Sequence, residues 1–280
     1  MNNTALVKLA LVFNFVEPLI AVRRNFGLLA QLVQRNVQQR YRGSMLGIVW
    51  SFCQPLLMLC VYTFVFGTVF KARWGVDVDQ AKGAFSIIMF CGIMMHSLMF
   101  EALNSSCMCI VGNQNLVKKV IFPLEILPLA QVLSVYVNGL AWIFLLFLGV
   151  VFVVGHASWT MLLLPVVFVP YVIFTLGFGY LVAALGVFVK DTAYVLGIVM
   201  QVLLFGTPIF YPLSAVPKDF QWILFWNPLT VFIEQARAVF VYGTMPNWHF
   251  LGIASLASLV VFQLGYYFFA RTKRGFADVL

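Results

Sequence analysis

The chain has 280 residues, of which 63% are hydrophobic and 9% are charged, and its net charge is +8. Soluble globular proteins carry about 25% charged residues. The few charges here cannot cover a water-exposed surface of this size, so the composition excludes a soluble globular protein. The basic excess is typical of cytoplasmic loops of a membrane protein. No basic block stands apart from the apolar runs, as a nucleic-acid surface would require.

Six apolar segments are long enough to cross a bilayer as helices, which takes about 20 residues. They cover residues 46–70, 85–110, 126–154, 161–189, 194–211 and 250–270. Because backbone groups in lipid must be hydrogen-bonded within their own segment, the sequence predicts an all-α integral membrane protein with six transmembrane helices. Residues 1–280 form a single domain. It comprises a cytoplasmic or interfacial N-terminal segment, 1–45, and a membrane domain, 46–270.

Lys and Arg residues are divided unequally between the loops on the two sides. Twelve of the 17 lie before the first span and after the second, fourth and sixth spans, and the other five lie in the alternate loops. Positively charged loops stay on the cytoplasmic side. We therefore expect both termini in the cytoplasm, which an even number of spans also requires.

The stretch from 17 to 41 is amphipathic rather than spanning. Arg and Gln side chains alternate in it with Leu and Val side chains. Such a helix can lie in the membrane interface, with its basic residues toward anionic head groups. Packing of the same helix on a soluble partner is the alternative.

Prolines and aromatic residues interrupt the region between the fifth and sixth spans. An apolar but short segment, 229–242, follows Pro228 and contains Glu234 and Arg237. Irregular backbone at membrane depth must be buried in protein or line a watery path, so we expect short re-entrant helices here. Glu234 and Arg237 are three residues apart and can pair on one helix face.

The sequence contains no motif for nucleotide binding, metal binding or catalysis. It has no P-loop, its three His residues are scattered, and its five Cys residues lie in apolar segments as small hydrophobic side chains. We therefore expect no catalytic residue, no metal and no cofactor in this chain. Glu101 is the one acid well within a span. It is interpreted as a structural acid facing the bundle, with a proton relay as the alternative.

Two further stretches are distinctive. Gly43 and Gly47, at the opening of the first span, form a small-x-x-x-small pair, which lets helices approach closely. Residues 115–128 form a short basic helix that ends at Pro123 and is followed by another helix start. This compact cytoplasmic knob is suited to a cleft on another protein.

Four separated stretches of this sequence resemble permeases of the ABC-2 type. The first is Arg40-Tyr41-Arg42-Gly43-Ser44-x-Leu46-Gly47-x-x-Trp50, continued by Pro55-Leu56 and Val61-Tyr62-x-Phe64-Val65-Phe66. The others are Leu116-Val117-Lys118-Lys119-Val120-x-Phe122-Pro123, Phe205-Gly206-Thr207-Pro208-Ile209-x-Tyr211-Pro212 and Trp226-Asn227-Pro228-Leu229. The chain is similar in particular to polysaccharide exporters of O-antigen, capsule or teichoic acid. The similarity covers about residues 25–275, while residues 1–18 have no counterpart.

The resemblance implies a homodimer in the bacterial inner membrane, with two cytoplasmic subunits that bind ATP and Mg. A lipid-linked polysaccharide, most specifically an O-antigen, would be exported, and membrane lipids would be further partners. It also implies roles for two groups of residues. The loop that couples to the ATPase would contain Asn115, Lys118, Lys119, Phe122, Pro123 and Glu125. The gate at the start of the first span would contain Arg40, Arg42, Gly43 and Gly47.

Aromatic side chains can line the path of a sugar polymer, because the apolar C–H faces of sugars stack on rings. Weak and repeated contacts of this kind let a long chain slide. The candidates are Trp50, Phe52, Tyr62, Phe64, Phe66, Phe210 and Tyr211. The alternative is that these rings face lipid or neighbouring helices.

Three other functions are compatible with a polytopic membrane protein. An ABC-2 exporter of a small amphiphile or drug is disfavoured by the Arg42-Gly43-Ser44 motif and the short loops. An ion-driven secondary transporter is disfavoured by the single intramembrane acid and by the lack of a repeat. A membrane-embedded transferase is disfavoured because the sequence has no catalytic pairs and no sizeable polar loop.

Overall fold

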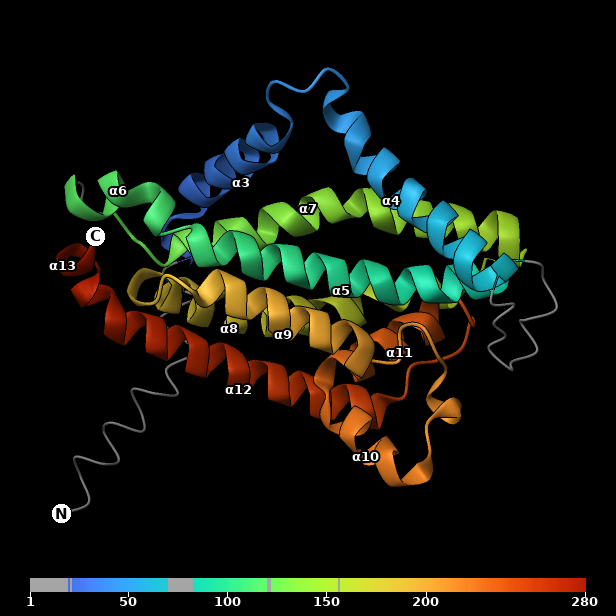
Figure 1. Cartoon of the computed structure of the whole chain (residues 1–280). Helices are drawn as coiled ribbons and strands as arrows, with labels where there is room; N and C mark the ends of the chain where they lie inside the picture. The colour runs from blue at the N-terminus through green and yellow to red at the C-terminus, as the bar shows by residue number, and fades with distance from the viewer. Residues whose placement is uncertain (1–19, 21, 70–82, 120–121, 156) are drawn as a thin grey trace, which may run out of the picture.

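The computed structural model describes residues 20, 22–69, 83–119, 122–155 and 157–280, and every regular element in them is helical (Figure 1). The extension at 1–18 lies outside these residues. The longer helices are α3 (Phe26–Tyr41), α4 (Trp50–Tyr62), α5 (Ala84–Met108), α7 (Ile126–Gly149), α8 (Leu164–Phe188), α9 (Thr192–Gly206), α11 (Pro228–Phe240) and α12 (Trp248–Thr272). The shorter helices are α6 (Gln114–Lys119), α10 (Lys218–Trp226) and α13 (Phe276–Val279).

Five continuous helical stretches in the described residues are long and apolar enough to cross a membrane. They are Gly47–Val69, Ala84–Met108, Ile126–Val154, Trp159–Phe188 and Trp248–Val279. The segment expected at 194–211 forms α9, which has 15 residues. At 1.5 Å per residue α9 is about 22 Å long, less than the roughly 30 Å of a hydrocarbon core. It ends at Gly206 because Pro208 keeps the preceding Thr207 in an extended conformation.

Helix α5 forms the centre of the bundle and is buried along most of its length. It packs against α7, α8, α9 and α11, and Figure 1 shows it running through the middle of the structure. Helices α8 and α12 form the closest pair because glycines face each other across it. A Cβ atom at Gly265 would lie 1.9 Å from the carbonyl oxygen of Gly177, so the two backbones are in direct contact.

Helices α3 and α4 lie on the outside of α7 and meet in a turn (Figure 1). Helix α3 is amphipathic, as predicted. Leu29 and Leu32 are buried, while Gln31, Gln34 and Arg35 are exposed. Helix α4 packs on α7 and leaves large apolar side chains exposed along its length.

The bundle has two distinct ends in Figure 1. Helices α6 and α13 and the C-terminus lie at one end, here called the α6 end, where α13 contacts α6. Helices α10 and α11 lie at the opposite end, here called the α11 end, near the last residues of the α4 segment. The α6 segment, the turn between α8 and α9 and the residues after α12, which were predicted to share one side of the membrane, thus lie at the same end, while the α3–α4 turn projects from the side of the bundle (Figure 1).

Candidate functional site: a polar cavity beneath the α3–α4 turn

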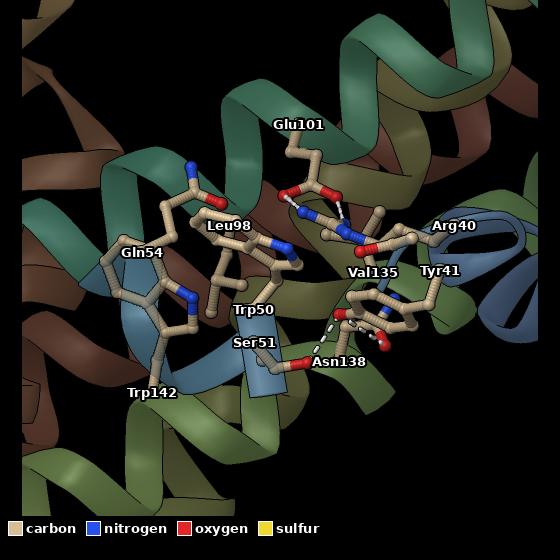
Figure 2. A pocket seen from close by; sticks show the side chains of 12 residues that line it. Arg40, Tyr41, Trp50, Ser51, Gln54, Leu98, Glu101, Val135, Asn138 and Trp142 are labelled. Atoms are coloured by element: carbon tan, nitrogen blue, oxygen red, sulfur yellow. Dashed lines mark hydrogen bonds and ion pairs between the residues drawn. The ribbon is translucent and has the colours of Figure 1, made fainter. Parts of the chain in front are cut away.

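A cavity of about 340 Å³ lies between the C-terminal end of α3, the start of α4, and helices α5 and α7. Its walls combine two indole rings with hydroxyl, amide, carboxylate and guanidinium groups (Figure 2). The lining residues are Arg40, Tyr41, Ser44, Trp50, Ser51, Gln54, Leu98, Glu101, Val135, Asn138, Gly139 and Trp142. We call this space the gate cavity. The gate candidate Arg40 and the path candidate Trp50 meet here, although they come from different helices.

Two polar contacts attach the end of α3 to the bundle across the gate cavity. Arg40 forms an ion pair with Glu101 of α5, in which Nη2 donates to Oε2 over 3.1 Å. The Ser51 hydroxyl donates to the Tyr41 hydroxyl, which donates in turn to Asn138 Oδ1 of α7 over 3.5 Å. Glu101 thus has a basic partner, as the interpretation of a structural acid requires. Both side chains of the pair are about one third exposed, so the contact is reversible and solvent-screened.

Indole rings and polar groups suit the gate cavity to a hydroxyl-rich ligand. Trp142 is held by stacking on Phe90, with 5.6 Å between the ring centroids. Gln54 and Asn138 supply amide donors and acceptors beside it. Polar groups that converge beside two ring faces can orient such a ligand by hydrogen bonding and stacking together.

Among the polar and aromatic lining residues, sequence reasoning missed Ser51, Gln54, Asn138 and Trp142. The one available signal was Asn138, an amide in the middle of an apolar span, because such a group seeks a partner on another helix. Nothing local indicated that this partner is Tyr41, which is 97 residues away.

The glycines at the gate have a different role from the one predicted. Gly43 and Gly47 have positive φ angles of 84° and 53°, and a Cβ atom at either position would meet nothing within 4 Å. The expectation of close helix packing by this pair is wrong within the chain. Both residues lie in or beside the α3–α4 turn, where the left-handed conformation favours glycine. Arg42 lines a second hollow of about 620 Å³ next to this turn.

The predicted path residues fall into separate places rather than one line. Tyr62, Phe66 and Phe210 form a cluster at the α11 end, with ring centroids 5.3 to 6.2 Å apart. Trp50 lies in the gate cavity, at the other end of α4. Phe52 packs edge-on against Phe144 of α7.

The two remaining path candidates, Phe64 and Tyr211, lie outside the cluster of Tyr62, Phe66 and Phe210. Phe64 is exposed on the outside of the bundle, as the lipid-facing alternative expected. Tyr211 is partly buried, and its hydroxyl donates to the carbonyl oxygen of Phe205 over 2.8 Å. It therefore closes the turn after α9.

Two of the sequence stretches that carried the resemblance contact each other. Asn227 Nδ2 donates to Thr207 Oγ1 over 2.9 Å, and Asn227 Oδ1 accepts from the backbone of Leu229 over 3.0 Å. Asn227 therefore caps α11 and holds the turn after α9 at the same time. Arg237 of α11 also reaches this turn and, as predicted, pairs with Glu234, with 2.7 Å between Nη1 and Oε1.

The coupling candidates lie at the α6 end of the bundle. Asn115 and Lys118 are exposed on α6, while Phe122 and Pro123 are partly buried. Glu125 is not free for a partner. Its carboxylate pairs with Lys273, and its carbonyl oxygen accepts from the Tyr180 hydroxyl over 2.9 Å.

The C-terminal residues braced against this loop were missed by sequence reasoning. Phe276 of α13 is fully buried against Phe188 and Phe269, with ring centroids 5.8 and 5.4 Å away. Helix α13 also contacts α6. The end of the chain is therefore part of the structure that positions the coupling segment.

The five long apolar helices of the described residues define an α-helical membrane protein, and sequence comparison identifies its family. The profile of the ABC-2 type transporter family matches residues 27–241. The chain belongs to this family of transporter membrane subunits.

Curated relatives narrow the resemblance to polysaccharide exporters. The chain is 27% identical over 257 residues to the O-antigen export system permease protein RfbA of Klebsiella pneumoniae, covering 91% of this chain and 95% of that one. It is 29% identical to RfbA of Myxococcus xanthus, covering 90% and 95%. It is 23% identical to the polysialic acid transport protein KpsM of Escherichia coli, covering 84% and 89%. The resemblance stated from the four sequence stretches is confirmed.

Proposed function

We propose that this chain is the membrane permease of an ABC-type system that exports a lipid-linked polysaccharide, an O-antigen, across the bacterial inner membrane. The observation that carries the proposal is the gate cavity, an open space lined by indole, amide and hydroxyl groups beside an amphipathic helix. A site of this kind admits a sugar from the membrane interface. The similarity to O-antigen permeases over nine tenths of the chain supports the same substrate class.

In this proposal the α6 end faces the cytoplasm. Helix α6, the turn between α8 and α9 and the residues that end and follow α12 lie there (Figure 1). These segments carry four exposed basic side chains, Lys118, Lys190, Arg271 and Arg274. Positive charge next to a span favours the cytoplasmic side. Helix α13 then lies at the inner surface, and α3 runs from near that end of the bundle to the gate cavity (Figure 1).

The sixth crossing of the proposal consists of α9 and the turn that follows it. Helix α9 covers about 22 Å by itself, and the turn at 207–211 continues toward the α11 end. Helices α10 and α11 then dip into the outer leaflet and return, which brings the chain to α12 on the outer side. The bonds that Asn227 makes to Thr207 and Leu229 support this arrangement, because they satisfy backbone and side-chain groups at that depth.

A second copy and two ATP-binding subunits complete the proposed transporter. Apolar side chains exposed on α4 and α9, such as Leu57, Val61, Ile198 and Val202, offer a face for the second copy or for lipid. ATP and Mg are assigned to the separate cytoplasmic subunits, because this chain carries no P-loop. Helix α6, on which Asn115 and Lys118 are exposed, is suited to be the element of the permease that docks on an ATP-binding subunit.

Deletion of the gene in its bacterium tests this function. Lipid-linked polysaccharide should accumulate on the cytoplasmic side of the membrane, and a plasmid copy should restore surface polysaccharide. The triple variant Lys118→Ala, Lys119→Ala, Phe122→Ala should reach normal abundance but restore neither export nor stimulated ATP hydrolysis. Lys218→Ala, an exposed lysine at the α11 end, is the matched control and should restore both.

Two results would refute the proposed function. One is a deletion strain that accumulates no lipid-linked glycan while it still displays the polymer at its surface. The other is transport by this chain alone in vesicles, driven by an ion gradient without the ATP-binding subunits. The second result would favour the secondary-transporter alternative, and export of small amphiphiles would favour the drug-exporter alternative.

A further inference from the structure

Arg237 is a fully buried arginine at the α11 end, remote from the gate cavity. A buried charge is costly unless hydrogen-bonding partners surround it. Its guanidinium donates from Nε to the carbonyl oxygen of Ile88, from Nη1 to that of Pro208 and from Nη2 to that of Ile209, over 3.1, 2.7 and 3.1 Å. Nη1 also contacts the Glu234 carboxylate. One side chain of α11 thus connects α5 to the turn that follows α9.

The bonds of Arg237 are directed at backbone that ends helix α9. Pro208 and Ile209 follow the extended residue Thr207, outside the helix. Their carbonyl oxygens therefore need other donors. The planar fork of a guanidinium can reach three carbonyl groups at once, which a lysine ammonium on a flexible stem cannot do in the same geometry.

Helix α5 is shaped to accept this side chain. Gly92 lies one helical turn after Ile88, and a Cβ atom at Gly92 would be 2.9 Å from Arg237 Nη2 and 3.3 Å from a methyl group of Ile209. A larger residue at 92 would push the guanidinium away from the turn. The glycine at position 92 of α5 therefore provides the space that the Arg237 guanidinium occupies.

The residue immediately after the anchored pair is Phe210. Its ring stacks on Phe66 with 5.3 Å between centroids, and it lies 5.9 Å from Tyr62 and 5.6 Å from Phe205. These four rings bridge the end of the α4 segment and the end of α9. The part of the α4 segment that carries Phe66 is a π-helical stretch, Thr63–Val69, a geometry that is frequent at functional sites.

We propose that Arg237 is a positioning residue that keeps the exit end of the permease closed: it fixes residues 208 and 209 against α5, so that the Phe210 ring seals against Tyr62 and Phe66. The inference rests on the proposed function in one respect, that the α11 end is the exit. The closed state is then maintained by the buried hydrogen bonds of Arg237 and not by contacts among the rings alone. Without these bonds the rings are still present, but they are no longer held together.

Leakage of the resting complex measures this role directly. The permease with its ATP-binding subunits is reconstituted without ATP into vesicles that contain a small anionic dye, and dye release is followed. Arg237→Met, which keeps the length but removes the donors, should raise the leak roughly tenfold, and Arg237→Lys should give an intermediate value. Glu234→Gln keeps the three carbonyl bonds of Arg237 and should remain as tight as the unchanged protein.

Two further variants separate the seal from general destabilisation. Phe210→Ala should leak by itself, and Arg237→Met combined with it should leak no more than Phe210→Ala alone, because both changes act on one seal. In a background without the native cysteines, Phe66→Cys and Phe210→Cys remove two rings of the seal and should leak before cross-linking. A short cross-linker between the two cysteines should then restore tightness, also when Arg237→Met is present. A purely structural role for Arg237 would not respond to this local cross-link.

The leak experiment and the gene deletion test the seal and the proposed function separately. Tight vesicles with Arg237→Lys and Phe210→Ala would overturn the inference even if Arg237→Met failed to fold, and so would a leak that the cross-link does not reduce. If the leaks follow the expected order while deletion of the gene leaves polysaccharide export intact, the seal stands and the proposed substrate falls.

Discussion

Replacing Gly265 by alanine should destabilise the bundle more than any other alanine substitution at a glycine of α12. The added Cβ would lie 1.9 Å from the carbonyl oxygen of Gly177 and 2.8 Å from its carbonyl carbon. Both are backbone atoms of α8, so no side-chain rotation can relieve the overlap. The two helices must separate by about 1.5 Å to reach an ordinary contact distance, and a gap of that size loses most of the dispersion energy along the seam.

The expected loss of stability follows from the contacts between α8 and α12. Overpacking alone costs about 1–3 kcal/mol. Separation would also weaken the contacts that Tyr180 makes with Tyr266 and Phe269, whose ring centroids are 5.3 and 5.4 Å away. Each aromatic pair contributes about 0.5–1.5 kcal/mol. The higher helix propensity of alanine returns up to about 1 kcal/mol. With central values for these three terms, the net loss in the free energy of unfolding is about 3 kcal/mol.

Thermal denaturation of the detergent-solubilised protein measures this loss. The fraction that remains monodisperse after heating is determined by size-exclusion chromatography, and the midpoint should fall for Gly265→Ala. Gly252→Ala is the matched control on the same helix, because a Cβ there meets nothing within 4 Å. The control should keep or slightly raise the midpoint. Equal midpoints for the two variants would refute the close contact between α8 and α12.

Two ion pairs give further predictions about activity. Arg40→Ala and Glu101→Gln should each lower polysaccharide export more than protein abundance, while the partly exposed pair contributes less than about 1 kcal/mol to stability. The charge-swapped double variant Arg40→Glu, Glu101→Arg should recover export. A double variant as impaired as either single one would contradict a role of this ion pair in export. Glu125→Gln and Lys273→Met each loosen the brace behind α6 and should reduce ATP hydrolysis by the assembled complex. Unchanged turnover in both variants would show that this brace plays no part in coupling.

Much of the helical architecture could be predicted from the sequence because it depends on local properties. Five of the six expected spans coincide with long apolar helices, since hydropathy over about 20 residues determines whether a segment belongs in lipid. The amphipathic helix before the first span and the Glu234–Arg237 pair also follow from helical spacing alone. The length of α9 was overestimated, because an apolar run continued past the point where Pro208 ends the helix.

The candidate site was predicted only in fragments. Arg40 and Trp50 were singled out from a motif, and Glu101 from its position in a span, but each was considered separately. Their common cavity depends on how α3, α4, α5 and α7 pack. The prediction for Gly43 and Gly47 failed for the same reason. A spacing of four residues describes a helix face, and these residues lie in or beside a turn where positive φ angles are required.

The amino-acid order by itself determined which segments are helical, which of them belong in lipid and where basic residues accumulate, because these properties depend on neighbours within a few turns of a helix. The tertiary structure decided which groups become partners. Arg237 bonds to Ile88 across 149 positions, Glu125 pairs with Lys273 across 148, and Arg40 with Glu101 across 61. A buried or half-buried charge takes whichever acceptor the packing of the helices brings within reach, and no local pattern records that choice.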